Sequence, residues 1–376
     1  LIMAKEMIKG NVAVAEAAVR AGLVSYFGYP ITPQTELLEY LSARMPELGR
    51  AFVQAESELG AINMVYGAAC TGLRTMSSSS SPGVSLMTEG ISYIYGTEVP
   101  AVLVDVMRGG PGLGNIAPSQ ADYTQIVHGG GHGEYHLIVL APSSVQEAID
   151  LTGEAFDLAE KYRTLAVILM DGFLGQMMEP CELPPFKEVN MESPDYAVAP
   201  KPGRERRFLT SINIDPPAQE KLNIHQMTKW EEITKNEVRY KGYYLEDAEY
   251  VVVGFGTCGR IALTAVREAR EQGIKVGLLR PVSLSPYPTE VLNELADRAK
   301  GFLVVEMNNG QMLDDVVSIV ARRAPVHFYG RMGGMVPYPD EIGRAINDMI
   351  EAKAANDYVG REDWLAQMRE MIGQGA

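Results

Sequence analysis

The sequence predicts an α/β protein built from two parallel-sheet domains. Short apolar runs alternate with amphipathic stretches at the spacing of βα units, a pattern typical of a parallel sheet covered on both faces. The run Ala101–Met107 is apolar on both faces and is expected to be a central parallel strand. Eight prolines from Pro180 to Pro217 interrupt the pattern, which resumes at Glu249. We therefore predict a first domain over 1–178, a proline-rich linker over 179–245, a second domain over 246–345 and a helical tail over 346–376.

The elements of the first domain follow from apolar periodicity and from turn residues. Asn11 is expected to cap the first helix and Gly22 to end it, and Pro82 is expected to open a later helix. The serine run Ser77–Ser81 is expected to be a loop near a polar ligand. The expected strands are 23–27, 51–54, 73–76, 101–107, 136–140 and 165–170, and the expected helices are 11–22, 33–44, 58–71, 82–95, 119–127 and 143–162.

The second domain repeats the alternation of apolar runs and amphipathic stretches. Its expected strands are 250–254, 275–279 and 302–306, and its expected helices are 259–272, 288–299 and 310–323. A charged helix is expected around 226–240 in the linker, and further helices are expected within 341–375.

Composition excludes several classes of function. The formal net charge of −15 argues against binding to nucleic acid or to an anionic membrane, because phosphate contacts need a basic surface. The three cysteines, Cys70, Cys181 and Cys258, are widely separated, so we expect neither an iron–sulfur cluster nor a zinc site in this chain. The apolar runs are far shorter than the roughly 20 residues of a bilayer span, and no signal peptide is visible. We therefore expect a cytoplasmic location.

The segment Phe27–Glu36 is the most informative stretch of the chain. A strand is expected to end here, and Gly28, Pro30 and Pro33 fix a turn. Thr32 before Pro33 predicts a helix N-cap followed by proline at the first helical position. The free N–H groups of a helix N-terminus at the carboxyl edge of a sheet favour an anion. The segment is therefore predicted to be an anion-binding turn.

Two charged residues stand at the ends of other predicted strands. Glu58 begins an apolar helix, where a carboxylate is either a cap on the helix dipole or a catalytic acid, and Glu56 is expected to be exposed. Arg108 follows the central strand and enters the glycine-rich loop Gly109–Gly114. It is placed either to grip a carboxylate with two parallel hydrogen bonds or to form a structural ion pair.

Two further patterns have ordinary structural explanations. The segment Gly254–Gly259 matches the GxGxxG fingerprint of dinucleotide-binding folds, but the acidic residue expected about 20 residues later is missing. A tight strand-to-helix turn is favoured over nicotinamide binding. His128, His132 and His136 would share one helix face, but intervening glycines break such a helix, so a mobile loop is favoured over a metal site. No GxSxG hydrolase motif is present.

Taken together, the motifs resemble the alpha subunit of 2-oxoacid:ferredoxin oxidoreductases, over essentially the whole chain. The resemblance is closest to the branched-chain type, which acts on 3-methyl-2-oxobutanoate (2-ketoisovalerate), and Gly112 through Tyr123 points to that type. The motifs that carry the family resemblance are Gly28-Tyr29-Pro30-Ile31-Thr32-Pro33, Glu56-Ser57-Glu58, Thr75 through Gly83, Arg108-Gly109-Gly110-Pro111-Gly112 and Leu279-Arg280-Pro281.

The resemblance implies a pyrimidine-type thiamine diphosphate domain followed by a transketolase C-terminal-like domain. It implies that Glu58 hydrogen-bonds N1′ of the aminopyrimidine, so that the 4′-nitrogen can take the thiazolium proton. It places Thr32 and Arg108 beside the substrate carboxylate, and Tyr29 and Pro30 beside the cofactor. The implied reaction is oxidative decarboxylation of a 2-oxoacid with coenzyme A as acyl acceptor.

The resemblance also implies that this chain holds only half of an active site. Met170-Asp171-Gly172 lacks the leading glycine and the later asparagine of the usual Mg²⁺-diphosphate motif. A beta subunit is therefore expected to hold the diphosphate and Mg²⁺, a ferredoxin-like subunit to hold iron–sulfur clusters, and a separate gamma subunit to complete the complex, with ferredoxin as acceptor. The alternatives are a 2-oxoglutarate enzyme of the same family, a nicotinamide-binding module that uses Gly254–Gly259, and a non-catalytic scaffold subunit.

Overall fold

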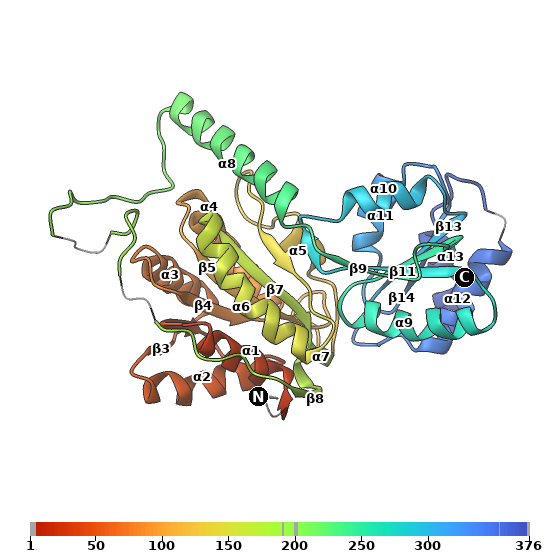
Figure 1. Cartoon of the computed structure of the whole chain (residues 1–376), viewed down its shortest axis with the longest axis horizontal. Coiled ribbons are helices and arrows are strands. Elements are labelled where there is room, and N and C mark those ends of the chain that lie inside the picture. The colour runs from red at the N-terminus through yellow and green to blue at the C-terminus, as the bar shows by residue number, and fades with distance from the viewer. Residues whose placement is uncertain (1–4, 190–191, 199–201, 353, 374–376) are drawn as a thin grey trace. The chain divides into compact units, whose positions relative to one another are not determined.

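The computed structural model describes residues 5–189, 192–198, 202–352 and 354–373 (Figure 1). The chain divides into two compact units, one formed by 1–107, 125–238 and 284–286, and the other by 108–124, 239–283 and 287–376. Residues 353 and 374–376 of the predicted tail lie outside the described residues. Among the residues described, no helix is long and apolar enough to span a bilayer.

The first unit is organised around a seven-stranded sheet with the order β12-β6-β7-β5-β4-β2-β3. The strands from β6 to β3 in this order pair in parallel. All seven residues of β5 are buried, which shows that helices cover both faces of the sheet. The strands are β2 (Ser25–Gly28), β3 (Ala51–Gln54), β4 (Thr75–Ser79), β5 (Ala101–Met107), β6 (Ile138–Leu140), β7 (Leu165–Asp171) and β12 (Ser283–Ser285).

The helices between these strands form two groups. Helix α1 packs on α2 and α6, and α3 packs on α4. Strands β1 (Glu6–Lys9) and β8 (Met178–Cys181) form a separate antiparallel pair. The helices are α1 (Gly10–Arg20), α2 (Thr35–Glu47), α3 (Glu58–Ala69), α4 (Pro82–Gly96), α5 (Tyr123–Val127), α6 (Val145–Tyr162), α7 (Gly172–Gln176) and α8 (Pro216–Asn236).

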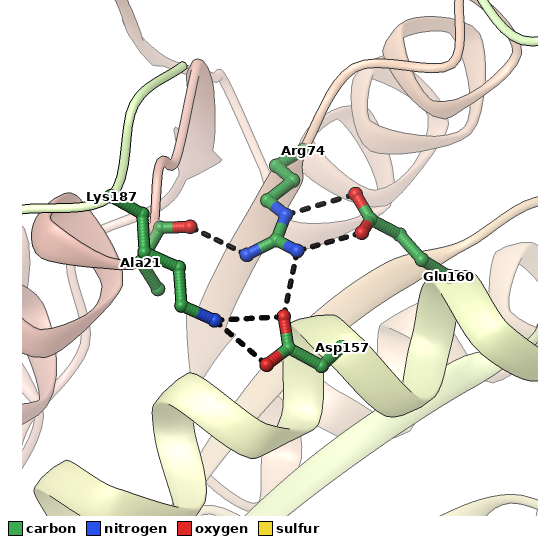
Figure 2. A network of polar contacts seen from close by, with 5 residues as sticks. All are labelled: Ala21, Arg74, Asp157, Glu160 and Lys187. Carbon is green, nitrogen blue, oxygen red and sulfur yellow. Dashed lines mark hydrogen bonds and ion pairs between the residues drawn. The ribbon is translucent and has the colours of Figure 1, made fainter. Parts of the chain in front are cut away.

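The beginning of the predicted linker is bound to the surface of the first unit by an ionic cluster (Figure 2). Arg74 donates to both carboxylate oxygens of Glu160 at 2.9 and 2.7 Å, and to Asp157 at 2.8 Å. A further nitrogen of Arg74 donates to the carbonyl of Ala21 at 2.6 Å. Lys187 reaches the same Asp157 at 2.7 and 3.0 Å. The cluster therefore connects the linker to α6 and to the strand that begins at 75.

The second unit contains a five-stranded sheet with the order β14-β13-β10-β11-β9, in which β9 alone is antiparallel to its neighbour. Strands β11 and β13, which flank the central strand β10, are fully buried. Its strands are β9 (Tyr240–Tyr243), β10 (Tyr250–Val253), β11 (Val276–Pro281), β13 (Gly301–Glu306) and β14 (Val326–Gly330), and its helices are α9 (Gly256–Glu271), α10 (Thr289–Ala296), α11 (Gln311–Val320), α12 (Pro339–Glu351) and α13 (Arg361–Met371).

Several predicted elements need correction. The serine run was predicted to be a loop, but Ser77–Ser79 belong to the buried strand β4, which pairs in parallel with β5. The linker helix begins at Pro216, where two prolines fit the first turn, instead of near 226. The predicted helix 119–127 is only the short α5. Strands β1, β8, β9, β12 and β14 were not predicted, and all have five residues or fewer.

Candidate functional site

The predicted anion-binding turn, residues 29–34, follows strand β2 at the carboxyl edge of the first sheet. Tyr29, Pro30 and Thr32 are exposed in this chain. The amide of Gln34 donates to the carbonyl of Ile31 at 3.2 Å, which closes a turn before the helix starts. Helix α2 begins one residue after Gln34, so the prediction that Thr32 is the helix N-cap was wrong.

Polar side chains from other elements form hydrogen bonds to this turn and to the first residues of α2. The carbonyl of Pro33 accepts hydrogen bonds from Asn11 Nδ2 at 2.7 Å and from Gln176 Nε2 at 3.2 Å. Glu36 accepts from the same two amides at 2.8 and 3.0 Å and pairs with Lys9 at 2.9 Å. Partial burial raises the pKa of Glu36, but the hydrogen bonds outweigh it and lower that pKa below its usual value. The turn is therefore fixed in place by a charged network.

A second, buried network supports the same turn and was missed in the sequence. Gln34 is fully buried, and its Oε1 accepts from Ser78 Oγ at 2.7 Å. Ser78 also bonds Tyr26 Oη at 2.7 Å, and Gln34 Nε2 donates to the carbonyl of Tyr29 at 3.3 Å. Burial raises the pKa of Tyr26, so its hydroxyl stays neutral. The side chain of Gln34 thus connects strands β2 and β4 to the exposed turn.

Glu58 is a buried acid at the first turn of helix α3. Ser57 is the N-cap, and its hydroxyl accepts from the amide of Gly60 at 3.1 Å, so the capping hydrogen bond belongs to Ser57. Glu58 is only 5% exposed, and its carboxylate has no hydrogen-bond or ion-pair partner among the described residues. Glu56 is exposed, as predicted. A carboxylate on so buried a residue has few waters to bond, which makes Glu58 a candidate for binding a ligand that can donate a hydrogen bond.

The surroundings of Glu58 are polar and closely packed. A Cβ atom at Gly83 would lie 2.5 Å from Glu58 Oε1 and 2.2 Å from Ser79 Oγ, so both side chains lie over this glycine. The buried hydroxyls of Ser77, Ser79 and Ser80 have no partner in the part of the chain that the structure describes. The hydroxyl of Ser79, at the carboxyl end of strand β4, therefore lies close to the Glu58 carboxylate.

Arg108 directly follows strand β5 but belongs to the second unit. It is 7% exposed, its Nη2 donates to the carbonyl of Leu113 at 2.9 Å, and its backbone forms an antiparallel bridge with Pro118. The glycine-rich segment therefore curls back on Arg108 as a closed loop. The structure thus brings Glu58 and the turn 29–34 to the carboxyl ends of the adjacent strands β3 and β2, and places Arg108 in the other unit.

The GxGxxG segment forms the expected strand-to-helix turn in the second unit. Helix α9 begins at Gly256, which has a φ of 51° that favours glycine. A Cβ atom at Gly259 would lie 2.5 Å from the carbonyl oxygen of Gly254 and 2.8 Å from Cγ of Arg280. The glycines are therefore explained by close packing of α9 against β11, without a nucleotide.

The three histidines are spaced four residues apart, as metal ligands on one helix face would be. The described residues contain no group of His, Cys, Asp and Glu side chains arranged to hold a metal ion. His136 stacks on Trp230 with ring centroids 4.7 Å apart, and burial lowers its pKa. His136 therefore packs the segment that follows Gly129–Gly133 against helix α8.

The arrangement in the first unit fits the aminopyrimidine of thiamine diphosphate. A protonated ring nitrogen is the kind of donor that the partnerless Glu58 carboxylate needs. The exposed turn after β2 borders the same sheet edge, where open α/β sheets bind ligands. Glu58 can hold a proton at that nitrogen, and the Ser79 hydroxyl lies close to the same carboxylate.

Family models cover nearly the whole chain. A model described as pyruvate flavodoxin/ferredoxin oxidoreductase, thiamine diphosphate-binding, matches residues 16–251, and a model described as pyruvate:ferredoxin oxidoreductase core domain II matches residues 248–342. The ketoisovalerate oxidoreductase subunit VorB of Methanothermobacter marburgensis is 50% identical over 355 residues, which cover 94% of this chain and 100% of that protein. The 2-oxoglutarate synthase subunit KorA of Methanocaldococcus jannaschii is 36% identical over 371 residues, which cover 92% of this chain and 100% of that protein.

Solved structures agree with these sequence matches. A 2-oxoglutarate:ferredoxin oxidoreductase from Magnetococcus marinus superposes with a TM-score of 0.83 at 26% identity, covering 93% of this chain and 66% of that chain. A split-gene transketolase superposes with a TM-score of 0.59 at 14% identity, covering 93% of this chain and 100% of that chain, which shows a shared fold alone. The predicted thiamine diphosphate-type fold with a transketolase C-terminal-like domain is thus confirmed. The chain belongs to the 2-oxoacid:ferredoxin oxidoreductase family, and it shares more identity with the branched-chain VorB subunit than with the KorA subunit.

Proposed function

We propose that this chain is the alpha subunit of an enzyme that oxidatively decarboxylates a branched-chain 2-oxoacid. The 2-oxoacid anion and the thiol of coenzyme A give the acyl thioester, CO₂, one proton and two electrons, and the electrons leave for ferredoxin. The structural observation that carries the proposal is the buried, partnerless carboxylate of Glu58 at the head of α3. The identity of 50% with VorB, against 36% with KorA, supports the branched-chain substrate.

In this proposal Glu58 activates the cofactor. Thiamine diphosphate, when bound, supplies the nucleophilic carbon and the electron sink for loss of CO₂. The Glu58 carboxylate accepts a hydrogen bond from N1′ of the aminopyrimidine and stabilises the tautomer whose 4′-nitrogen is basic. Burial strengthens this hydrogen bond, because few waters compete for the carboxylate. Tyr29 and Pro30 contact the cofactor from the exposed turn.

The substrate carboxylate is bound by Thr32 and Arg108 in the same proposal. Thr32 is exposed on the turn after β2, where its hydroxyl lies 3.4 Å from that of Thr35. Arg108 supplies the positive charge from the closed loop that follows β5. An arginine is suited to this role because its planar fork matches a carboxylate.

The remaining groups of the reaction are assigned to partners. Asp171 caps α7, since its Oδ1 accepts from the amides of Phe173 and Leu174 at 3.0 and 3.1 Å. This capping role supports the proposal that Asp171 does not bind Mg²⁺. A beta subunit is proposed to hold Mg²⁺ and the diphosphate. A ferredoxin-like subunit carries the iron–sulfur clusters, a gamma subunit completes the complex, and the location is cytoplasmic. The units 1–178, 179–245, 246–345 and 346–376 remain our proposed domain division.

The substrate class is tested by a turnover panel on the purified complex. The panel compares 3-methyl-2-oxobutanoate, pyruvate, 2-oxobutyrate and 2-oxoglutarate, with coenzyme A and a viologen dye as electron acceptor. The proposal expects the highest kcat/KM with the branched substrate. A preference for 2-oxoglutarate would support the second candidate function, a 2-oxoglutarate:ferredoxin oxidoreductase, which is suggested by the 36% identity with KorA.

The role of Glu58 is tested with Glu58→Gln and with Glu56→Gln as the matched control. The amide removes the charge that favours the reactive tautomer, so kcat is expected to fall at least about 100-fold while the complex still assembles. Glu56 is exposed two residues earlier in the chain and is expected to tolerate the same change. Wild-type turnover of the Glu58 variant would refute the assignment.

A further inference from the structure

The second sheet has the kind of topological switch point at which open α/β sheets usually bind ligands. Strand β11 lies on one side of β10 and β13 lies on the other, so the chain order reverses between β10 and β13. In open parallel sheets, ligands bind outside the carboxyl ends of the two strands at such a switch point. The GxGxxG turn follows β10 at this edge. In this chain a segment of the protein itself lies there.

Gln120 spans the switch point as a small ligand would. It is fully buried, and its side chain donates to the carbonyl of Phe255 at 3.0 Å and accepts from the amide of Met307 at 3.1 Å. Its backbone amide donates to the carbonyl of Met307 at 3.1 Å. Its carbonyl accepts from Asn308 Nδ2 at 2.8 Å. One glutamine thus joins the residues that follow β10 to those that follow β13.

The residues beside Gln120 are held by the same edge of the sheet. Gln311 donates to the carbonyl of Ala121 at 2.7 Å and accepts from the amide of Thr124 at 2.7 Å. Tyr123 is fully buried, bonds Asp315 and packs on Phe255 with ring centroids 5.6 Å apart. Residues 120, 121, 123 and 124 are therefore all held by residues that follow β10 or β13, two through their side chains and two through their backbone.

Asn308 is itself oriented by a buried acid. Its Nδ2 donates to Glu306 Oε2 at 2.9 Å, and the two Glu306 oxygens also accept from the amides of Met312 and Leu313 at 2.9 Å each. The Asn308 Oδ1 accepts from the amide of Gly310 at 2.7 Å. All donors and acceptors of the Asn308 amide are thus directed, and its hydrogen bond to the Gln120 carbonyl has a single geometry.

The anchored segment continues directly into the loop that carries Arg108. The backbone bridge between Arg108 and Pro118 closes the loop two residues before Gln120. The amide of Gly109 donates to the carbonyl of Ala117 at 2.9 Å, and Asn115 Nδ2 donates to the carbonyl of Gly333 at 2.9 Å. The loop 108–118 is therefore a closed structure whose base is fixed by Gln120.

We propose that Gln120 and Asn308 are positioning residues. They anchor the base of the loop 108–118 to the second sheet, and this anchoring holds Arg108 where it can bind the 2-oxoacid. The inference rests on the proposed substrate role of Arg108. It explains why the fingerprint turn is retained without a nucleotide: the carbonyl of Phe255 in that turn binds the Gln120 side chain. A displacement of about 1 Å at a binding group can reduce catalytic efficiency about 100-fold.

The test is a double-mutant cycle between Gln120→Ala and Arg108→Ala in the assembled holoenzyme. Each single variant is expected to raise KM for 3-methyl-2-oxobutanoate at least tenfold, with KM for coenzyme A unchanged and kcat within threefold. Adding Gln120→Ala to Arg108→Ala is expected to change KM less than twofold, because Gln120 acts through Arg108. Asn308→Ala and the milder Gln311→Ala are expected to follow Gln120→Ala with smaller effects.

The control is Met349→Ala, which removes a buried side chain of the second unit away from the loop. It is expected to lower the melting temperature without changing KM for the 2-oxoacid. Two results would refute the positioning role of Gln120 and leave the substrate role of Arg108 standing. One is a KM in the double variant that equals the product of the two single effects. The other is an unchanged KM in both Gln120→Ala and Gln311→Ala while Arg108→Ala raises it. An unchanged KM in Arg108→Ala would instead refute the proposed substrate role of Arg108 and this inference with it.

Discussion

Gly83→Ala is the sharpest test of the geometry around Glu58. The added Cβ would lie 2.5 Å from Glu58 Oε1 and 2.2 Å from Ser79 Oγ, whereas ordinary contacts at a Cβ begin near 3.4 Å. The carboxylate must therefore move by about 1 Å, because the helix backbone that carries the new methyl group is held by its own hydrogen bonds. A misplacement of this size in a catalytic group costs about 100-fold in rate, or about 3 kcal/mol of transition-state stabilisation.

The assay compares kcat and the apparent affinity for thiamine diphosphate in the assembled complex. With the role proposed for Glu58, Gly83→Ala is expected to lower kcat/KM about 100-fold and to weaken cofactor binding, because the carboxylate is displaced from its position opposite N1′. Gly153→Ala is the matched control, because a Cβ at Gly153 within α6 meets no atom within 4 Å. The control is expected to be neutral or to stabilise the chain by about 0.5 kcal/mol. Wild-type turnover and cofactor affinity in Gly83→Ala would refute the reasoning.

Two further predictions concern stability. Burial raises the pKa of Glu306 to about 7, so its contribution to the free energy of unfolding is fully present below pH 4.5 and is lost as pH rises through about 7. Glu306→Gln is therefore expected to flatten the dependence of the free energy of urea unfolding on pH between 4.5 and about 7. An unchanged dependence on pH would contradict this prediction. Arg74→Leu leaves the carbonyl of Ala21 and the carboxylate of Glu160 without their donor and leaves Asp157 with Lys187 alone, so the free energy of unfolding is expected to fall by about 2 kcal/mol, and a change below about 0.5 kcal/mol would contradict a stabilising role of the cluster.

The regular α/β framework was largely predictable from the sequence. Strands β3 and β5 have the predicted bounds to the residue, because each is an apolar run between clear turn or helix signals. Strand β4 was predicted only in its first residues, since serines do not resemble strand residues and are usually exposed. Its side chains point to the two faces of the sheet and are buried there by packed elements such as α3, which is a tertiary effect. The buried acid at Glu58 was suggested by position, but its lack of partners required the structure.

The support of the turn 29–34 was not predictable, because its members lie far apart in the chain. Gln34 meets Ser78 across 44 residues, and Pro33 meets Gln176 across 143 residues. Neither pairing leaves a local pattern of spacing or charge. The same holds for the segment 108–124, whose assignment to the second unit depends on hydrogen bonds from Gln120 to residues near 307.

In the second unit, the GxGxxG pattern of dinucleotide-binding folds has structural partners within the chain itself. Three glycines in a strand-to-helix turn meet two needs in a dinucleotide fold, close packing of helix on strand and close approach of a phosphate. Here the first need is visible, since Gly259 lies against Arg280 and Gly254. In place of a phosphate, the buried side-chain amide of Gln120 approaches the turn and donates to the carbonyl of Phe255. A fingerprint of this kind therefore indicates the geometry of the turn, and the residues that contact the crevice decide what it holds.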